Sequence, residues 1–483
     1  MTTLRPTVTA LDGSSRLGAR VLCLPIGPEG RKHFAMRLAP RTTRKTHDSN
    51  RDPHSKSIVR LLSQPLALLL FAGCLALNGC SASTEPDDSA PVANASNEAT
   101  ESQPVEIDFE TASYDATSDE LLASRLPSEE TREGWVRLFD GHTLFGWEST
   151  GKANFRVEEG AIVVDQGKPA LLCSSSTWGD FELTLEFKAT KTTNSGVFVR
   201  TPLEPENPEL DCYEINIAPL DNPFPTGSLV GRQKADAVEP VDAWREMRII
   251  ADGKDVRVEI DGETVCRYQD PVDLPARRVG LQHRKGRVAF RAIKIRPLGL
   301  EPLLDEGLTQ WTRYPEMPGK FEMSDDQTLH VTGGSAQLET EQSYGDFTLL
   351  AEYKIDQPGM NSGLFFRCIP GDKMMGYECQ INNDFKDDSR LMPEDCGTGG
   401  IFRRQDARLV AGENGSWATV LLQAHGTKIS AWVNGIGVSD WEDTREEHEN
   451  PRKGRRTEPG TIMIQAHDPK TDLLYRNLKI ASP

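Results

Sequence analysis

The chain has 483 residues, with 55 Lys and Arg against 73 Asp and Glu, so its net charge is −18. This length is about three times the ~150 residues of an average domain. Residues 1–79 carry 12 basic and 4 acidic residues, so the rest of the chain is more acidic than the total suggests. An acidic body argues against a nucleic-acid partner, because nucleic acids are polyanions.

Residues 1–79 have the features of an export segment. Residues 61–77 are a short apolar run that follows basic residues and is interrupted by a proline. This pattern is typical of a secretory signal and is too short for a membrane span. The run leads into the string LNGC, which ends at Cys80 and resembles a bacterial lipobox. We therefore expect a lipid anchor on Cys80 and a location in the cell envelope, at the outer membrane or the periplasmic face. The alternative is an ordinary signal followed by an unmodified, buried Cys80.

The segment after Cys80 is acidic and poor in large apolar side chains. Residues 81–130 hold 13 acidic residues and one basic residue, among many Ser, Thr, Pro and Ala. Such a composition cannot bury enough apolar surface to offset the entropy of ordering. We therefore predict that residues 80–130 form a disordered acidic tether.

The body of the chain is one module present twice. The matched strings keep the same order in both copies: NSGVFVR (194–200) with NSGLFFR (361–367), YEINI (213–217) with YECQI (377–381), and VRVEIDGETV (256–265) with ISAWVNGIGV (429–438). A repeat of this length indicates a duplicated domain rather than a short solenoid repeat. We place the two domains at residues 131–298 and 299–483.

The matched strings alternate between apolar and polar residues, as half-buried strands do. Asp261-Gly262 and Asn434-Gly435 lie between paired strings, and both dipeptides tolerate the positive φ angles of a type I′ hairpin turn. Many short strands without a long amphipathic helix predict an all-β fold, a β-sandwich or jelly roll.

Alternation also predicts which polar side chains lie together. In the second copy, Asn361, Phe365 and Arg367 share one face of their strand, and Glu378 and Gln380 share a face of the next. The first copy repeats the pattern with Asn194, Arg200 and Glu214. Amides, carboxylates, arginines and an aromatic ring on one sheet face are typical of a sugar-binding groove. The alternative is an ordinary solvated face, whose exposed ion pairs contribute little stability.

The order of these motifs resembles the 3-keto-disaccharide hydrolase family, which is abundant in planctomycetes and Bacteroidetes. The resemblance covers essentially all of residues 133–483, in two copies. It implies two tandem concanavalin-A-like jelly-roll β-sandwiches and cleavage of the glycosidic bond of 3-keto-glycosides or 3-keto-disaccharides. It also implies an oligosaccharide or glycoside as the binding partner.

The two copies differ at the positions that the resemblance marks. The second copy keeps the family's glutamine at Gln380 and its histidine at His467. In the first copy Asn216 replaces the glutamine, and His283 is displaced by one residue. We therefore expect the second copy to be catalytic, and the first to bind sugar or to act on a different one.

The implied reaction needs a base, an acid and a positive group. A carbonyl at C3 acidifies the C2 proton, so a base can remove it while the glycosidic oxygen leaves C1 and water then adds. We predict Glu378 or His467 as base or acid, Arg367 at the enolate oxygen, and Asn361 and Gln380 at hydroxyl groups. We expect no cofactor, and no metal-binding spacing is visible in the sequence, although a divalent metal stays possible.

Two other functions fit the same sequence. A non-catalytic, lectin-like module on the cell surface would use the same polar face, since one fold hosts several functions. Direct hydrolysis of an unoxidised β-glucan would need a pair of carboxylates, and no convincing two-acid strand motif is present.

Overall fold

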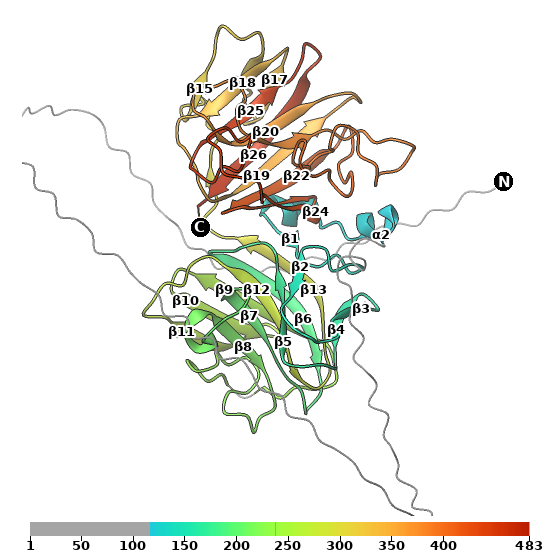
Figure 1. Ribbon diagram of the computed structural model, residues 1–483, viewed down its shortest axis with the longest axis vertical. Coiled ribbons are helices and arrows are strands. Elements are labelled where there is room, and N and C mark those ends of the chain that lie inside the picture. Colours follow the sequence, from blue (N-terminus) through green and yellow to red (C-terminus); the bar gives the residue numbers. More distant parts are fainter. Residues whose placement is uncertain (1–115, 237, 483) are drawn as a thin grey trace, which may run out of the picture. The chain divides into compact units, whose positions relative to one another are not determined.

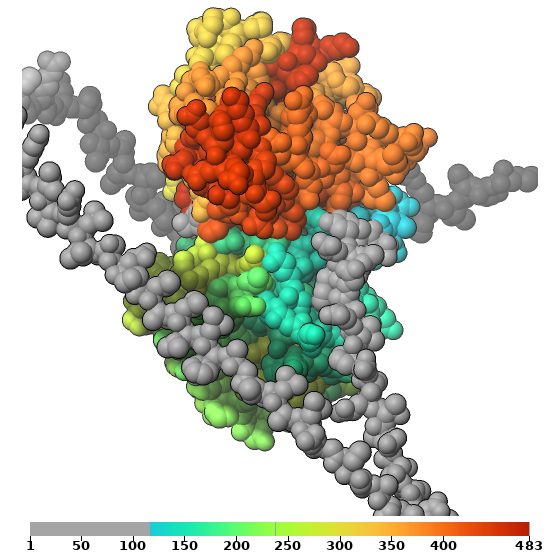
Figure 2. Space-filling view, in the orientation of Figure 1, coloured from blue at the N-terminus to red at the C-terminus, as the bar shows by residue number. Residues whose placement is uncertain are grey.

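The computed structural model describes residues 116–236 and 238–482, whose regular secondary structure is almost entirely strand (Figure 1). They form two β-sandwiches in tandem, each with an eight-stranded and a five-stranded antiparallel sheet. Each sandwich encloses a large apolar cluster and is a closely packed body in the space-filling view (Figure 2). The prediction of an all-β chain with two tandem concanavalin-A-like jelly rolls is confirmed.

The first domain is built from two sheets and one short helix. Its larger sheet has the order β11 (Glu263–Gln269), β10 (Asp255–Ile260), β9 (Arg245–Asp252), β6 (Phe181–Ala189), β13 (Val288–Pro297), β4 (Ala161–Val164) and β3 (Arg156–Glu158), with β1 (Val136–Arg137) paired to β13. Its smaller sheet has the order β2 (Trp147–Ser149), β5 (Ala170–Ser174), β12 (Arg278–Lys285), β7 (Asn194–Thr201) and β8 (Tyr213–Ile217). The helix α4 (Pro208–Asp211) precedes β8.

The second domain repeats this topology strand for strand. Its larger sheet has the order β16 (Lys320–Met323), β17 (Leu329–Thr332), β26 (Asp472–Ala481), β19 (Phe347–Ile355), β22 (Trp417–His425), β23 (Lys428–Val433) and β24 (Ile436–Glu442), with β14 (Glu301–Pro302) paired to β26. Its smaller sheet has the order β15 (Trp311–Arg313), β18 (Ala336–Thr340), β25 (Thr461–Ala466), β20 (Ser362–Cys368) and β21 (Tyr377–Ile381).

The two predicted hairpin turns are confirmed. Asp261 and Gly262 join β10 to β11 with φ angles of 51° and 81°. Asn434 and Gly435 join β23 to β24 with φ angles of 50° and 81°. Positive φ at both central positions is what a type I′ turn requires, and Asp, Asn and Gly tolerate it.

The smaller sheet of the second domain has one apolar and one polar face. Leu364, Phe366 and Cys379 belong to the domain's main apolar core. The opposite face carries Phe365, Glu378, Gln380, Met463 and Gln465, and we call it the polar face. Alternation along each strand produces this division, so the site is built on a rigid sheet.

The segment that leads into the first domain is ordered where the structure describes it. It contains the helices α2 (Ser118–Ala123) and α3 (Ser128–Arg132). Thr117 and Glu120 form a reciprocal capping box at the start of α2, and Leu121 is buried in the core of the second domain. The prediction of disorder is therefore wrong for residues 116–130, because capping and burial offset the ordering entropy.

Residues 80–115, Cys80 among them, and the export segment 1–79 lie outside the described residues. Among the helices that the structure describes, none is long and apolar enough to span a membrane.

Candidate functional site

The central strand of the polar face is β20, and its neighbours bring the predicted residues to it. Phe365 lies opposite Glu378 on β21 and opposite Met463 on β25. Gly363 lies opposite Gln380. A Cβ atom on Gly363 would come within 2.7 Å of the Glu378 Oε1 atom. The absence of a side chain at this position is therefore what makes room for the Glu378 carboxyl group.

Glu378 is a buried carboxyl group without a fixed partner. Its residue is 8% exposed, and none of the hydrogen bonds among the described residues involves its carboxyl oxygens. Burial raises its pKa to about 7, Arg452 opposes the rise and the nearby charge of Asp395 adds to it. A carboxyl group with a pKa near 7 can both accept and donate a proton at neutral pH.

Asp395 organises two of the predicted amide side chains. The Gln380 Nε2 atom donates to the Asp395 carbonyl oxygen at 2.8 Å and to its Oδ2 atom at 2.9 Å, and the Asn361 Nδ2 atom also donates to Oδ2. The Asn361 Oδ1, Gln380 Oε1 and Gln465 Oε1 atoms are buried and lack a protein partner in the described part of the chain. Unpaired buried acceptors are costly, so these three oxygens are suited to receive the hydroxyl groups of a ligand.

Sequence reasoning missed two acids of this region. Asp395 lies in a loop at φ +46°, outside any strand, so alternation cannot find it. A comparison of the two copies gives one sign that Asp395 is functional, because the acid is present in the second copy only: the aligned residue of the first copy is Pro223. Glu339 lies opposite Met463, which in turn lies opposite Phe365, so the three residues form one row across the polar face. It is already engaged, since its carboxylate accepts from the Thr461 hydroxyl at 2.6 Å and from the Tyr314 hydroxyl.

Phe365 does not offer an open stacking surface. Its residue is 1% exposed, and it packs with Cys368, Met374 and Met463 in a small apolar cluster. The structure therefore places the ring in the floor of the site, where a sugar could stack on it only if the covering side chains moved.

Arg367 does not share the face of Phe365, and the prediction that it does is wrong. The pairing of β20 with β25 shifts after Phe365, and Arg367 itself has φ +48°. This bulge gives Cys368 the place that alternation assigned to Arg367. The guanidinium group of Arg367 donates to the carbonyl oxygens of Gly345, Gly426 and Arg456 and to the Asp346 carboxylate. It therefore serves to hold loops together.

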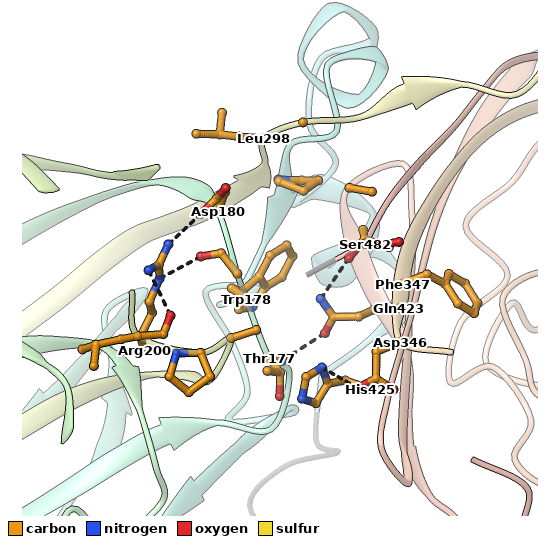
Figure 3. Close-up of a pocket in the computed structure, with 18 of the residues that line it drawn as sticks. Thr177, Trp178, Asp180, Arg200, Leu298, Asp346, Phe347, Gln423, His425 and Ser482 are labelled. Atoms are coloured by element: carbon orange, nitrogen blue, oxygen red, sulfur yellow. Dashed lines mark hydrogen bonds and ion pairs between the residues drawn. The ribbon is translucent and has the colours of Figure 1, made fainter. Parts of the chain in front are cut away.

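Arg200 repeats this arrangement in the first domain. It has φ +50°, is 1% exposed, and its Nη2 atom lies 2.7 Å from the Asp180 Oδ1 atom. Figure 3 shows this ion pair and the contact of His425 with Asp346. All four residues line one cavity of about 790 Å³. Neither Glu378 nor Glu214 lines that cavity.

His467 lies apart from Glu378. It follows the end of β25, its side chain is 42% exposed, and its Nδ1 atom is 3.3 Å from the Asp468 Oδ2 atom. It comes four residues after Met463, which lies in the row of Phe365 and Glu378. At ~3.3 Å per residue, that is about 13 Å along the strand. His467 and Glu378 are thus not placed to share one proton.

The first domain keeps part of the site. Burial raises the pKa of Glu214 to about 7, and Gly196 leaves space beside it as Gly363 does beside Glu378. However, the Nδ2 atom of Asn216 donates to the carbonyl oxygen of a neighbouring loop. Asn194 begins β7 and is half-buried. The first domain therefore has the carboxyl group but not the amide arrangement that Asp395 supports.

A cavity of about 210 Å³ adjoins Glu378 in the second domain. It is lined by Gly376, Tyr377, Glu378, Phe402, Arg403, Arg404, Pro451 and Arg452. In residues 116–236 and 238–482, no group of three or more His, Cys, Asp or Glu side chains is arranged to hold a metal ion. The prediction that the protein works without a cofactor stays a prediction.

Comparisons with known proteins agree with this domain organisation. The sequence model of a family described as the 3-keto-α-glucoside-1,2-lyase-like domain matches residues 134–296 and again residues 299–481. No curated protein matches the chain.

Solved structures similar to the chain each span about one domain. A candidate glycosyl hydrolase from Parabacteroides distasonis is 19% identical, covers 36% of this chain and 99% of its own, and has a TM-score of 0.33. A second structure of that description from the same organism is 24% identical, with 34% and 99% coverage and a TM-score of 0.29. The carbohydrate binding module CBM66 from Bacillus subtilis is 14% identical, with 31% and 95% coverage and a TM-score of 0.26.

The two family matches together cover well over half of the chain, and each coincides with one β-sandwich. The chain therefore belongs to the 3-keto-disaccharide hydrolase family and carries two tandem copies of its domain.

Proposed function

We propose that the protein cleaves the glycosidic bond of 3-keto-glycosides, 3-keto-disaccharides among them, on the polar face of the second domain. The family makes it a carbohydrate-active, glycosyl-hydrolase-like protein. The observation that carries the proposal is the state of Glu378: a buried carboxyl group with a pKa near 7, free of protein partners in the described chain, beside a cavity.

The chemistry follows from the C3 carbonyl group of the substrate. A base removes the C2 proton, and the electron pair moves onto the C3 oxygen as an enolate. The enolate then collapses to a C1–C2 double bond, and the glycosidic oxygen leaves C1 with a proton. Water adds to C1 and a proton returns to C2, so the net reaction is hydrolysis.

Glu378 is suited to both proton transfers. In its ionised form it takes the C2 proton, and in its protonated form it gives a proton to the leaving glycosidic oxygen. A group that does both needs a pKa near the working pH. The positive field of Arg403 and Arg452 favours the enolate. The free oxygens of Asn361 and Gln380 receive sugar hydroxyl groups. We leave Arg367 and His467 out of the chemical step, because the first is fully engaged elsewhere and the second is distant.

For the first domain we propose glycan binding. Glu214 is retained there, whereas Asn216 is tied to a loop carbonyl and no acid takes the place of Asp395. We further propose that Cys80 carries the lipid that holds both domains at the cell envelope.

The test is product analysis of 3-keto-disaccharides in heavy water. Elimination followed by hydration places one deuterium at C2 of the released 3-keto sugar, which mass spectrometry detects. Glu378→Gln should abolish turnover, and Glu214→Gln, its match in the first domain, should preserve it. Cleavage without deuterium at C2 would point to direct hydrolysis, and binding without cleavage would establish the lectin-like alternative.

A further inference from the structure

Three arginine side chains share the cavity beside Glu378. Arg403 and Arg404 come from the loop after β21, and Arg452 from the connection between β24 and β25. The Arg404 guanidinium donates to the carbonyl oxygens of Arg403 and Arg452, and Arg452 donates to that of Met374. In the described part of the chain, none of the three forms a salt bridge with a carboxylate. Carbonyl groups position the side chains of Arg404 and Arg452 but do not neutralise them.

The first domain shows how such an arginine is usually compensated. Arg232 aligns with Arg404, and its Nε atom lies 3.4 Å from the Asp270 Oδ2 atom. In the second domain the matching acid is Asp443, but it forms its salt bridge with Arg445, whose Nη2 atom lies 2.7 Å from the Asp443 Oδ2 atom. Arg445 lies in the 18-residue connection from β24 to β25, which has only 8 residues in the first domain. The longer connection thus supplies a salt-bridge partner that Asp443 takes in place of Arg404, and it adds Arg452 to the same cavity.

Arg403 is held in an unfavourable backbone conformation. It has φ +58°, and the first domain has Gly231 at the matching position with φ +73°. A side chain in this region strains the backbone, and such strain persists where the surrounding structure fixes it, often at ligand sites. The guanidinium carbon of Arg403 lies 5.1 Å from the centre of the Phe402 ring, which also lines the cavity. Arg403 is therefore positioned at the cavity despite the cost.

We propose that this cavity binds a negatively charged substituent of the sugar, a carboxylate or a sulfate ester, so that the second domain selects acidic glycans. The inference rests on the proposed function, because it takes the polar face as the sugar site. A developing enolate needs one positive partner, whereas this cavity holds three guanidinium groups without a salt bridge in the described chain, and Glu378 is the one carboxyl group that lines it. Like charges this close repel one another, so an anion that joins them is favoured. Guanidinium groups bind oxyanions through paired, charge-assisted hydrogen bonds.

The test is calorimetric binding to the full chain of three unoxidised probes: methyl glucoside, methyl glucuronide and methyl glucoside 6-sulfate, as α and β anomers. At least one acidic probe should bind roughly 10-fold to 100-fold more tightly than the neutral one, since a hydrogen bond to a charged group contributes that much. Comparison of the glucuronide with the sulfate shows whether the cavity prefers a carboxylate or a sulfate ester. The preference should shrink with added salt.

Two variants assign the preference to this cavity. Arg403→Gly, which copies the first domain, and Arg452→Gln should each reduce the preference at least fivefold, while Arg267→Ala on the exposed face of β11 should leave it unchanged. Thermal unfolding verifies that each variant is folded. Equal affinity for neutral and acidic probes, no measurable binding of either acidic probe at millimolar concentration, or a preference that survives both variants would overturn the inference.

The same probes, oxidised at C3, separate this inference from the proposed function. If neutral and acidic 3-keto-glycosides are cleaved with equal kcat/KM, the function stands and the charge selectivity fails. If acidic probes bind selectively and no 3-keto form is cleaved, the selectivity stands and the proposed reaction fails.

Discussion

Replacing Glu378 by Gln should stabilise the second domain at alkaline pH and leave its stability unchanged in acid. Burial raises the pKa of Glu378 from 4.5 to about 7 in the folded chain. Between these values the folded state binds more protons than the unfolded state, so the free energy of unfolding falls as the pH rises through this window. The full penalty is present above the folded-state pKa and amounts to about 3 kcal/mol at 1.36 kcal/mol per pKa unit. Glutamine stays neutral and removes it.

Hydrogen exchange followed by mass spectrometry suits this measurement, because one unfolding free energy is poorly defined for a two-domain chain. Peptides from β20 and β21 should gain about 3 kcal/mol of protection in Glu378→Gln at pH 8 and none at pH 4. Peptides from β7 and β8 of the first domain serve as the internal control and should not change in this variant. In Glu214→Gln the peptides from β7 and β8 should gain the protection instead, since burial also raises the pKa of Glu214 to about 7. A gain that is equal at both pH values would show that the carboxyl group is not held near neutrality.

Three further substitutions, the first with a matched control in the other domain, have definite expected outcomes. Gly363→Ala should lower kcat on the order of 10²-fold by displacing the Glu378 carboxyl group, whereas Gly196→Ala in the first domain should have little effect, and steady-state kinetics compares them. Arg367→Ala should cost on the order of 3 kcal/mol of stability, seen in thermal unfolding, because three carbonyl oxygens lose their donor at about 1–3 kcal/mol each. The kcat/KM value per folded molecule should be retained. Cys80→Ser should abolish the incorporation of labelled palmitate and release the protein from membranes, and labelling that persists would exclude acylation at this cysteine.

The sequence was sufficient for whatever depends on local periodicity. The duplication, the turns at Asp261-Gly262 and Asn434-Gly435, and the all-β fold follow from repeated strings, turn chemistry and alternation. Glu378 and Gln380 lie on one face because they are two residues apart on β21, a strand of five residues that alternation describes throughout.

Alternation fails wherever the backbone leaves the regular strand. The bulges at Arg200 and Arg367 reverse the faces at the ends of β7 and β20, and nothing in the residue types announces the positive φ. Asp395 reaches the site from a loop, so its position depends on tertiary packing. Residues 116–130 have a disordered composition, yet local caps and a buried Leu121 order them.

The divergence of the two domains is concentrated in the connections, and packing explains why. Both small sheets keep a glycine beside a buried glutamate, because the core face of each strand constrains its sequence and register. The connection from β24 to β25 lies outside that core and could lengthen without disturbing it. That single change supplies Arg452, pairs Asp443 with Arg445 and leaves Arg404 without a salt bridge in the described chain. Differences in sugar selectivity between the domains should therefore follow this connection and the loop after β21 that carries Arg403, rather than the sheet.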